Sequence, residues 1–307
     1  MSSASASASD STKPFLSTIL TLINFSALDV AVDVLAAPPM HVIFYLYVFL
    51  GVIQFISSSI LLATVIVQAR LREKYSILIV KFLVDIATAI CLIVIGALNR
   101  DSEKQCSATL VISTAIPLAQ VLLLLCEVID WILAAFSPIY FHSSSLFSRI
   151  LPFIVGAACG TIIMTALIII DVTQPHRSCI KSPTGSAVTT AYDFSLGIAT
   201  MCVFALGILL HRNLNSTFFR PVAFHFFATL FLIELPLTTV ICLNYLGNSG
   251  AFTAADVTNL LIGVYSLVHS IYFVYNHEDY RQGILSTFFR YCALQRTQRP
   301  QNPSNGV

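Results

Sequence analysis

Long runs of apolar residues, separated by short polar segments, follow one another along almost the whole chain. Seven of these runs reach the length of about 20 residues that a helix needs to cross the hydrocarbon core of a bilayer. Because lipid offers the backbone no hydrogen-bond partners, such runs form helices. The pattern predicts an all-α membrane protein, a seven-transmembrane helix bundle, with spans at about residues 42–68, 76–98, 105–136, 150–170, 188–210, 221–246 and 251–276.

A further apolar stretch, residues 15–37, lies in the segment 1–41 that precedes the first span. Its Asp29 and Asp33 are four residues apart and therefore share one face of a helix. Each acid costs about 2.5–3.5 kcal/mol at the centre of a membrane-spanning helix. We therefore expect segment 1–41 to be extracellular and partly amphipathic rather than an eighth span.

The composition narrows the class of protein. Only 10% of the 307 residues are Asp, Glu, Lys or Arg, and 57% are apolar, whereas soluble domains are roughly 25% charged. The net charge of +1 leaves no basic surface for nucleic acid. A soluble enzyme, a disordered protein and a nucleic-acid-binding protein are all disfavoured.

The basic residues predict the orientation, because Lys and Arg collect in cytoplasmic loops. With the N-terminus outside, ten of the sixteen basic residues fall on the cytoplasmic side and five fall outside, with Lys81 inside a span. This orientation places the tail, residues 277–307, in the cytoplasm. The run from Tyr280 to Tyr291 is typical of a short amphipathic helix on the inner membrane face.

The inner end of the third span carries a recognisable motif. Asp130 is followed four residues later by Ala134 and eight residues later by Pro138. This spacing resembles the Asp-Arg-Tyr box of rhodopsin-like G-protein-coupled receptors, with Trp131 in the place of the arginine.

Other spans carry single positions of the same family's motifs. Asp85 falls where these receptors keep a buried acid, and Pro236 matches the Trp-x-Pro motif of the sixth helix. In the seventh span Tyr272 matches the Asn-Pro-x-x-Tyr motif, while His269 replaces its proline. The whole chain looks most like the divergent serpentine chemoreceptors of nematodes.

That resemblance implies a chemosensory function, as in olfaction. A small molecule would bind from outside, and a heterotrimeric G protein would be activated inside. The location would be the plasma membrane, including that of a sensory cilium. The sixth helix, bent at Pro236, would be the moving part. The implied switch and coupling residues are Asp85, Asp130, Trp131, Pro236, His269, Tyr272, Arg149, Arg212 and Arg220.

The resemblance also implies an outer disulfide. Cys106 lies twenty-four residues before Asp130, where these receptors place the third-helix cysteine, and Cys179 lies in the loop where its partner belongs. Of the eight cysteines, these two are the ones at predicted extracellular positions, where oxidation is favoured.

The family binds ligands among the outer halves of the third, fifth, sixth and seventh spans. Ser113 stands where amine receptors carry an aspartate, so we expect a non-amine ligand of moderate polarity, with Phe194 as an apolar wall. Glu234 has two interpretations: a neutral acid bonded to a neighbouring helix, or a pocket-floor group that moves the kink. The candidate ligand-binding residues are Ser113, Thr114, Tyr192, Asp193, Ser195, Glu234, Thr238, Thr258 and Asn259.

Ionisable residues inside spans are functional hypotheses by default. Lys81 and Asp85 are four apart and could neutralise each other; alternatively, Asp85 faces His269, which would act as a protonatable lock. We expect Glu127 and Asp130 to reach the membrane interface and to be solvated. His211 and His225 are expected to bond to backbone or headgroups near the inner ends of their spans.

Catalytic chemistry has little support in the sequence. No Gly-x-Ser-x-Gly context surrounds the serines, and no His-x-x-x-His or Cys-x-x-Cys pair occurs. We therefore expect no catalytic residues, no cofactor and no metal. Because Trp131 replaces the arginine, the alternative is a seven-helix channel or transporter without G-protein coupling. A third possibility is a receptor-like protein that acts in trafficking without signalling.

Overall fold

A computed structural model describes residues 40–68, 71, 76–98, 103–137, 146–173, 186–212, 219–246 and 250–297. The chain divides into two units, residues 1–43 and 44–307. Of the first unit only the start of one helix, residues 40–43, is described, so the predicted amphipathic stretch 15–37 lies outside the described residues. The following description concerns the second unit.

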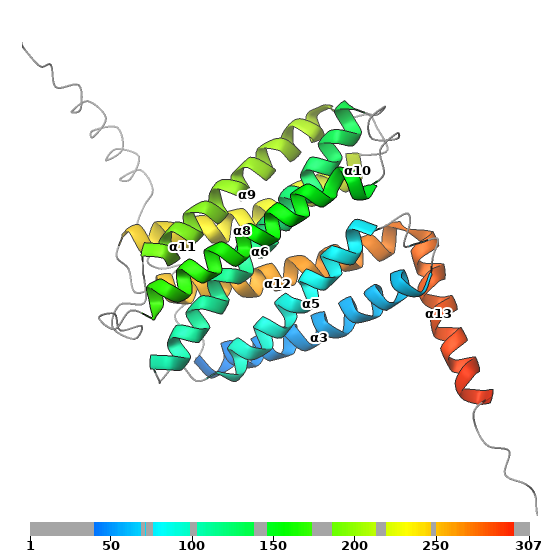
Figure 1. Ribbon diagram of the computed structural model, residues 1–307, viewed down its shortest axis with the longest axis horizontal. Helices are drawn as coiled ribbons and strands as arrows, with labels where there is room; N and C mark the ends of the chain where they lie inside the picture. Colours follow the sequence, from blue (N-terminus) through cyan, green and yellow to red (C-terminus); the bar gives the residue numbers. More distant parts are fainter. Residues whose placement is uncertain are drawn as a thin grey trace, which may run out of the picture. The chain divides into compact units, whose positions relative to one another are not determined.

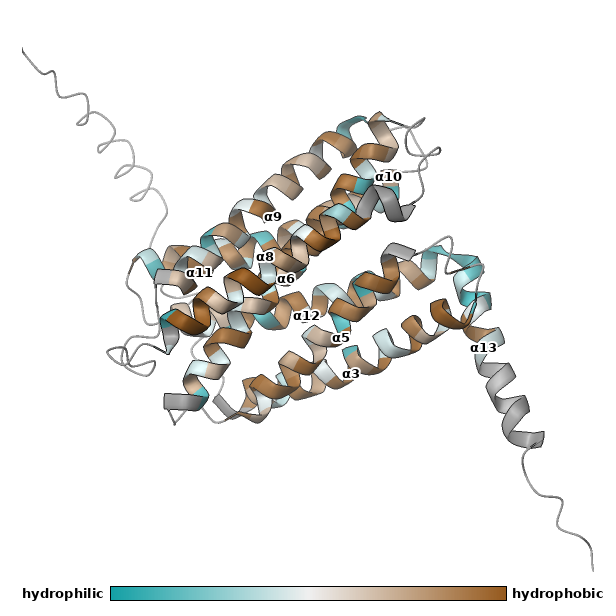
Figure 2. Ribbon diagram, viewed as in Figure 1, coloured by the Kyte–Doolittle hydropathy of each residue, from teal (hydrophilic) through white to brown (hydrophobic). Residues whose placement is uncertain are grey.

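The regular structure of the described ranges is entirely helical (Figure 1). Seven helices in these ranges are long and apolar enough to cross a membrane, which confirms the predicted number (Figure 2). Six of them are α3 (Met40–Val67), α5 (Ser76–Ala97), α6 (Glu103–Phe136), α8 (Leu146–Val172), α9 (Ser186–Arg212) and α12 (Ala251–Asn276). The sixth span in chain order consists of α10 (Phe219–Thr229), the π-helix η1 (Leu230–Glu234) and α11 (Leu235–Tyr245). Helix α13 (Glu278–Thr297) follows the last span.

Helix α6 is the central helix of the bundle. It packs against α5, α8, α9 and α12, and 67% of its most apolar window is buried. The corresponding window of α8 is only 6% buried, so α8 covers one side of α6 and presents most of its surface outward. Polar side chains of α6 therefore lie in the interior, whereas an apolar exterior suits lipid.

The sixth span is one continuous helix of three parts: α10, η1 and α11. Pro236, near the start of α11, has no backbone N–H and cannot bond to the preceding turn. The π-helix at residues 230–234 lies directly before it, and such wide turns accommodate local disruption of the helical hydrogen bonds. The predicted kink position thus coincides with a π-helical turn, which sequence reasoning did not anticipate.

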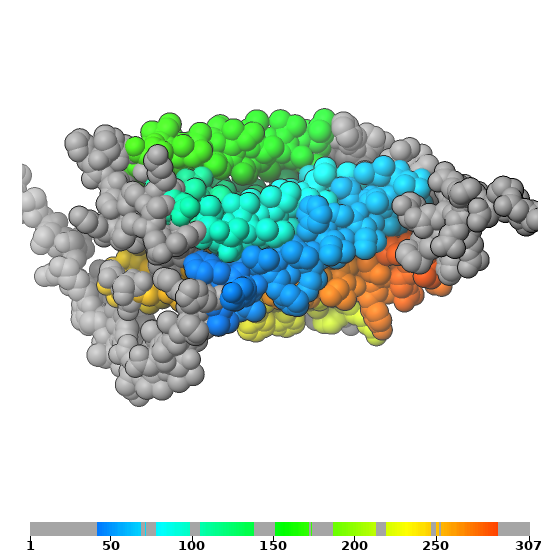
Figure 3. Space-filling model, turned by 90° about the horizontal axis from the view of Figure 1, so that it is seen from below, coloured from blue at the N-terminus to red at the C-terminus, as the bar shows by residue number. Residues whose placement is uncertain are grey.

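Helices α3 and α5 lie side by side on one face of the unit (Figure 3). Two glycines allow this close approach. A Cβ atom on Gly51 would lie 2.8 Å from the Ala89 carbonyl oxygen, and one on Gly96 would lie 2.8 Å from the Phe44 carbonyl oxygen. Close backbone contact through small residues is a principal source of helix association in membranes.

We expect Gly51→Ala to destabilise the folded protein by about 1–3 kcal/mol, because the new methyl group meets backbone that cannot move aside alone. The matched control is Gly156→Ala, since nothing lies within 4 Å of a Cβ there. That control should be neutral or stabilising by up to about 1 kcal/mol. Unfolding by SDS in mixed micelles measures both; equal stabilities would contradict the close packing.

Helix α13 begins directly after α12 and is anchored to the end of α3. The Tyr280 hydroxyl donates to the Leu61 carbonyl oxygen, and Gln68 Nε2 donates to the Gly283 carbonyl oxygen at 2.7 Å. Burial raises the pKa of the Tyr280 phenol well above its usual range. A helix is therefore present where the sequence predicts one, although its amphipathic role at a membrane remains a prediction.

Candidate functional site

Asp85 of α5 is the centre of a buried hydrogen-bond network. Its Oδ1 accepts hydrogen bonds from Ser266 Oγ of α12 at 2.8 Å and from Gln120 Nε2 of α6 at 3.2 Å. Gln120 also donates to Thr88 Oγ1 at 3.0 Å, and Gln54 Nε2 of α3 donates to the Asp85 carbonyl oxygen at 3.1 Å. All five residues are buried, so the network joins four helices inside the bundle.

Lys81 lies one helical turn from Asp85 and is only 1% exposed. Its Nζ is 4.0 Å from Asp85 Oδ2, so the predicted pair of opposite charges on α5 is present. Glu127 of α6 is a second partner, with its Oε1 3.9 Å from the same Nζ. The ammonium also lies 5.5 Å from the centre of the Tyr265 ring, within the range of a cation–π interaction.

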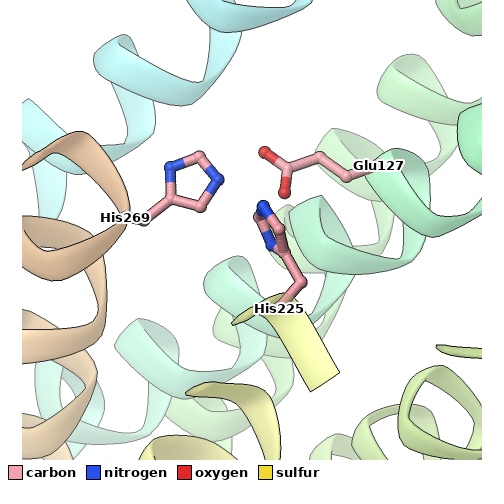
Figure 4. Close-up of side chains that lie close together, drawn as sticks. All are labelled: Glu127, His225 and His269. Atoms are coloured by element: carbon pink, nitrogen blue, oxygen red, sulfur yellow. The ribbon is translucent and has the colours of Figure 1, made fainter. Parts of the chain in front are cut away.

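Aromatic and imidazole rings connect α10 to α6 and α12. The His225 ring of α10 meets Trp131 of α6 edge to face at 4.5 Å and His269 of α12 at 4.6 Å. One residue earlier, Phe224 stacks on Tyr272 of α12 with centroids 3.8 Å apart. The side chains of Glu127, His225 and His269 point toward one another (Figure 4).

These contacts correct three predictions. Glu127 is not solvated at the interface, because the Lys81 ammonium on α5 provides a buried counter-charge. His225 does not reach headgroups, because its ring packs among other rings in the interior. The third corrected prediction is that Asp85 faces His269. On α12 the hydrogen-bond partner of Asp85 is Ser266, three residues before His269, and the His269 ring lies against His225.

Four candidate ligand-binding hydroxyls donate to carbonyl oxygens of their own helices. Ser113 and Thr114 both donate to the Leu110 carbonyl oxygen, at 3.0 and 2.7 Å. Thr238 donates to Glu234 and Thr258 to Ala254, each at 2.8 Å to the carbonyl oxygen. Such local bonds are the usual way for a hydroxyl to be satisfied inside a helix, so these four oxygens can offer a ligand only acceptor positions.

Asn259 and Ser195 have no hydrogen bond at any polar atom of their buried side chains. Asn259 of α12 is fully buried, and neither its Nδ2 nor its Oδ1 is hydrogen-bonded. Ser195 of α9 is also fully buried, and its Oγ has no partner. Because a buried unpaired polar group is costly, these atoms are suitable positions for a polar ligand or ordered water.

The remaining candidates on α9 divide between interior and surface. Tyr192 is buried. Asp193 is half-buried and accepts a hydrogen bond from the exposed Tyr245 hydroxyl at 3.0 Å. Phe194 is 48% exposed, so the prediction that it forms an apolar wall of the pocket is wrong. Its side chain lies on the outer face of α9, whereas those of Tyr192 and Ser195 lie on the inner face.

Glu234 bonds to a neighbouring helix, as one of its two interpretations proposed. Its Oε1 accepts a hydrogen bond from Thr200 Oγ1 of α9 at 2.7 Å, while its Oε2 is buried without a partner. Glu234 is the last residue of η1. The interaction therefore ties the π-helical turn to α9.

The three predicted coupling arginines and Asp130 lie near the ends of their helices. Arg212 is exposed and its guanidinium lies 4.2 Å from the centre of the Phe136 ring, which joins the ends of α9 and α6. Arg220 is exposed at the start of α10, and Asp130 is half-buried near the end of α6. Arg149 belongs to α8, but its side chain lies outside the described residues.

The cysteines test the predicted disulfide only in part. Cys106 is buried near the start of α6, and Cys179 lies outside the described residues, so their pairing stays a prediction. Five cysteines within the described ranges are free thiols: Cys91, Cys126, Cys159, Cys202 and Cys242.

A hollow of about 290 Å³ lies between α5, α6 and α8. Its walls are apolar, and none of the candidate ligand-binding residues lines it. Val80, Val84, Ala119, Leu123, Cys126 and Ile154 are among the lining residues. This surface groove is distinct from both the polar network and the predicted pocket.

No protein-family model matches the chain, and no curated protein does so either. The seven apolar helices suggest an integral membrane protein. Within the described residues, its interior contains a cluster of one lysine, two carboxylates and two histidines, namely Lys81, Asp85, Glu127, His225 and His269, contributed by α5, α6, α10 and α12.

Proposed function

We propose that the chain is a chemosensory receptor of the plasma membrane, sensory cilia included, which binds a small non-amine molecule from outside and signals through a heterotrimeric G protein. The N-terminus is then outside, the α13 end of the bundle is cytoplasmic, and Cys106 forms a disulfide with Cys179. The observation that carries the proposal is the construction of the sixth span. Its inner part, α10, is held to α6 and α12 by ring contacts, and the π-helical turn η1 follows α10 directly in the chain.

This construction supports a two-state switch. The ring contacts at His225, Trp131 and Tyr272 hold α10 against its neighbours in the inactive state. The π-helical turn and Pro236 weaken the continuity of the helix, so α10 can move separately from α11. A ligand that binds the outer half more tightly in the moved state shifts the population toward it.

The test is expression in cultured cells, with cAMP and calcium measured against a panel of volatile and moderately apolar molecules. A response that disappears when G-protein activation is blocked supports the proposal. A ligand-gated current that survives the block would favour the alternative, a channel or transporter. That alternative is supported by the gathering of buried ionisable residues from four helices, since such groups also form ion and proton paths.

We expect Tyr272→Ala to raise signalling without ligand. The stacked pair with Phe224 joins α10 to α12, and such aromatic pairs contribute about 0.5–1.5 kcal/mol. Loss of the pair from the inactive state should increase basal signalling about two- to tenfold, because 1.4 kcal/mol corresponds to a factor of ten. Basal cAMP and calcium, normalised to surface expression, measure the change.

The matched control is Tyr275→Ala on the same helix, where the side chain is 74% exposed. Its basal signalling should equal that of the unaltered receptor. Equal basal signalling in Tyr272→Ala and Tyr275→Ala would show that the stacked pair does not restrain α10.

A further inference from the structure

We propose that Glu127, His225 and His269 bind a zinc ion that links α6, α10 and α12. The three side chains come from helices that are distant in sequence, and each is buried. One carboxylate and two imidazoles face a common point (Figure 4). This arrangement gives the protein interior a set of metal ligands that no short sequence motif contains.

The distances are suitable for a single small cation. The three ligand atoms all lie within 4.8 Å of one another. A point between them is therefore at most about 2.8 Å from each atom, whereas zinc bonds to imidazole and carboxylate are about 2.0–2.2 Å long. Each ligand atom would have to move toward that point by about 0.6–0.8 Å at most.

The charges around the site also favour a cation. Lys81, Asp85 and Glu127 bring one ammonium and two carboxylates into the interior, so negative charge is in excess when all three are ionised. The Lys81 Nζ lies 3.9 Å from Glu127 Oε1, which is longer than a hydrogen bond. The Glu127 carboxylate can therefore turn toward a metal, and a divalent zinc would change the net charge of these three groups from −1 to +1.

The donor atoms select the kind of metal. Calcium and magnesium prefer sites built from oxygen atoms alone, whereas imidazole nitrogen suits zinc and its first-row neighbours. Two histidines and one glutamate form a common zinc ligand set, with a fourth position open to water. We therefore assign the site to zinc.

A bound zinc would oppose the switch proposed above. Bonds from the metal to both His225 and Glu127 would add to the ring contacts that hold α10 against α6. Zinc should then reduce the maximal agonist response. This consequence depends on the proposed function, but the binding of the metal does not.

The test is zinc binding by the full-length protein in detergent micelles, measured by equilibrium dialysis and elemental analysis. We expect one zinc per chain, and a loss of affinity of about 100-fold or more in each of Glu127→Gln, His225→Gln and His269→Gln, since even outer partners of a zinc ligand contribute about 10–100-fold. The matched controls are His211→Gln and Glu278→Gln, whose side chains are exposed. They should bind zinc like the unaltered protein.

A fourth variant tests the site even if the three site variants do not fold. His225→Cys keeps a metal ligand, so with cobalt as the probe it should show a thiolate-to-cobalt absorption band that the unaltered protein lacks. Absence of zinc binding in the unaltered protein, equal binding in the three site variants, or a folded His225→Cys variant without the band would each overturn the site. Zinc binding without any effect on signalling would contradict only the switch.

Discussion

Replacement of Lys81 by methionine should destabilise the bundle by about 3–5 kcal/mol, the usual cost of breaking a buried ion pair by removing one partner. Lys81 is 1% exposed and lies within 4.0 Å of carboxylate oxygens of both Asp85 and Glu127. The methionine fills a similar volume but leaves two buried acids without this cation. The free energy of unfolding in mixed SDS micelles measures the loss.

Two further variants give this prediction its controls. Arg281→Met removes a basic residue whose side chain is exposed on α13, and it should change stability by less than about 0.5 kcal/mol. The double variant Lys81→Met with Glu127→Gln removes one of the two carboxylates that lose their counter-charge, so it should be more stable than Lys81→Met alone. A Lys81→Met protein as stable as the unaltered one would show that the two acids do not depend on this ammonium.

Apolar run length was enough to predict the seven helices, because each span must satisfy its backbone internally whatever its neighbours are. The pairing of Lys81 with Asp85 was equally accessible, since residues four apart share a helix face. Both features are local, and both are present in the structure.

The rest of the site depends on contacts between helices, which a single sequence does not specify. Glu127 looked like an interfacial residue because its partner, Lys81, lies on another helix. The receptor-like resemblance pairs His269 with Asp85 and does not indicate that His225 lies against His269. Gln120 and Ser266, which bond to Asp85, are not among the predicted site residues, although a glutamine inside an apolar span is itself a signal of a buried partner.

The π-helical turn was also beyond sequence reasoning. Pro236 indicated a disruption of the sixth span, but a proline can be accommodated by a bend, a missing hydrogen bond or a wide turn. Which of these occurs depends on neighbouring helices. Here the turn ends at Glu234, whose hydrogen bond to Thr200 ties it to α9.

Asn259→Leu should separate ligand binding from stability. Asn259 is fully buried, and both polar atoms of its amide lack a hydrogen-bond partner. Leucine has a similar size and removes this unpaired group, so the ligand-free protein should be unchanged or more stable by about 1–3 kcal/mol. Under the proposed function these atoms bond to the ligand, and their loss should reduce agonist potency about tenfold to hundredfold.

The two effects have opposite signs, which makes the experiment decisive for this residue. Dose–response curves in cells give potency, and SDS unfolding of the purified protein gives stability. Thr239→Val on α11 is the control, because Thr239 is exposed and its hydroxyl donates to the Leu235 carbonyl oxygen of its own helix; agonist potency should not change in this variant. A stabilised Asn259→Leu protein with unaltered potency would remove Asn259 from the binding site. A protein destabilised by more than about 1 kcal/mol would instead show that the asparagine is hydrogen-bonded in the ligand-free bundle, through ordered water or a rotated amide.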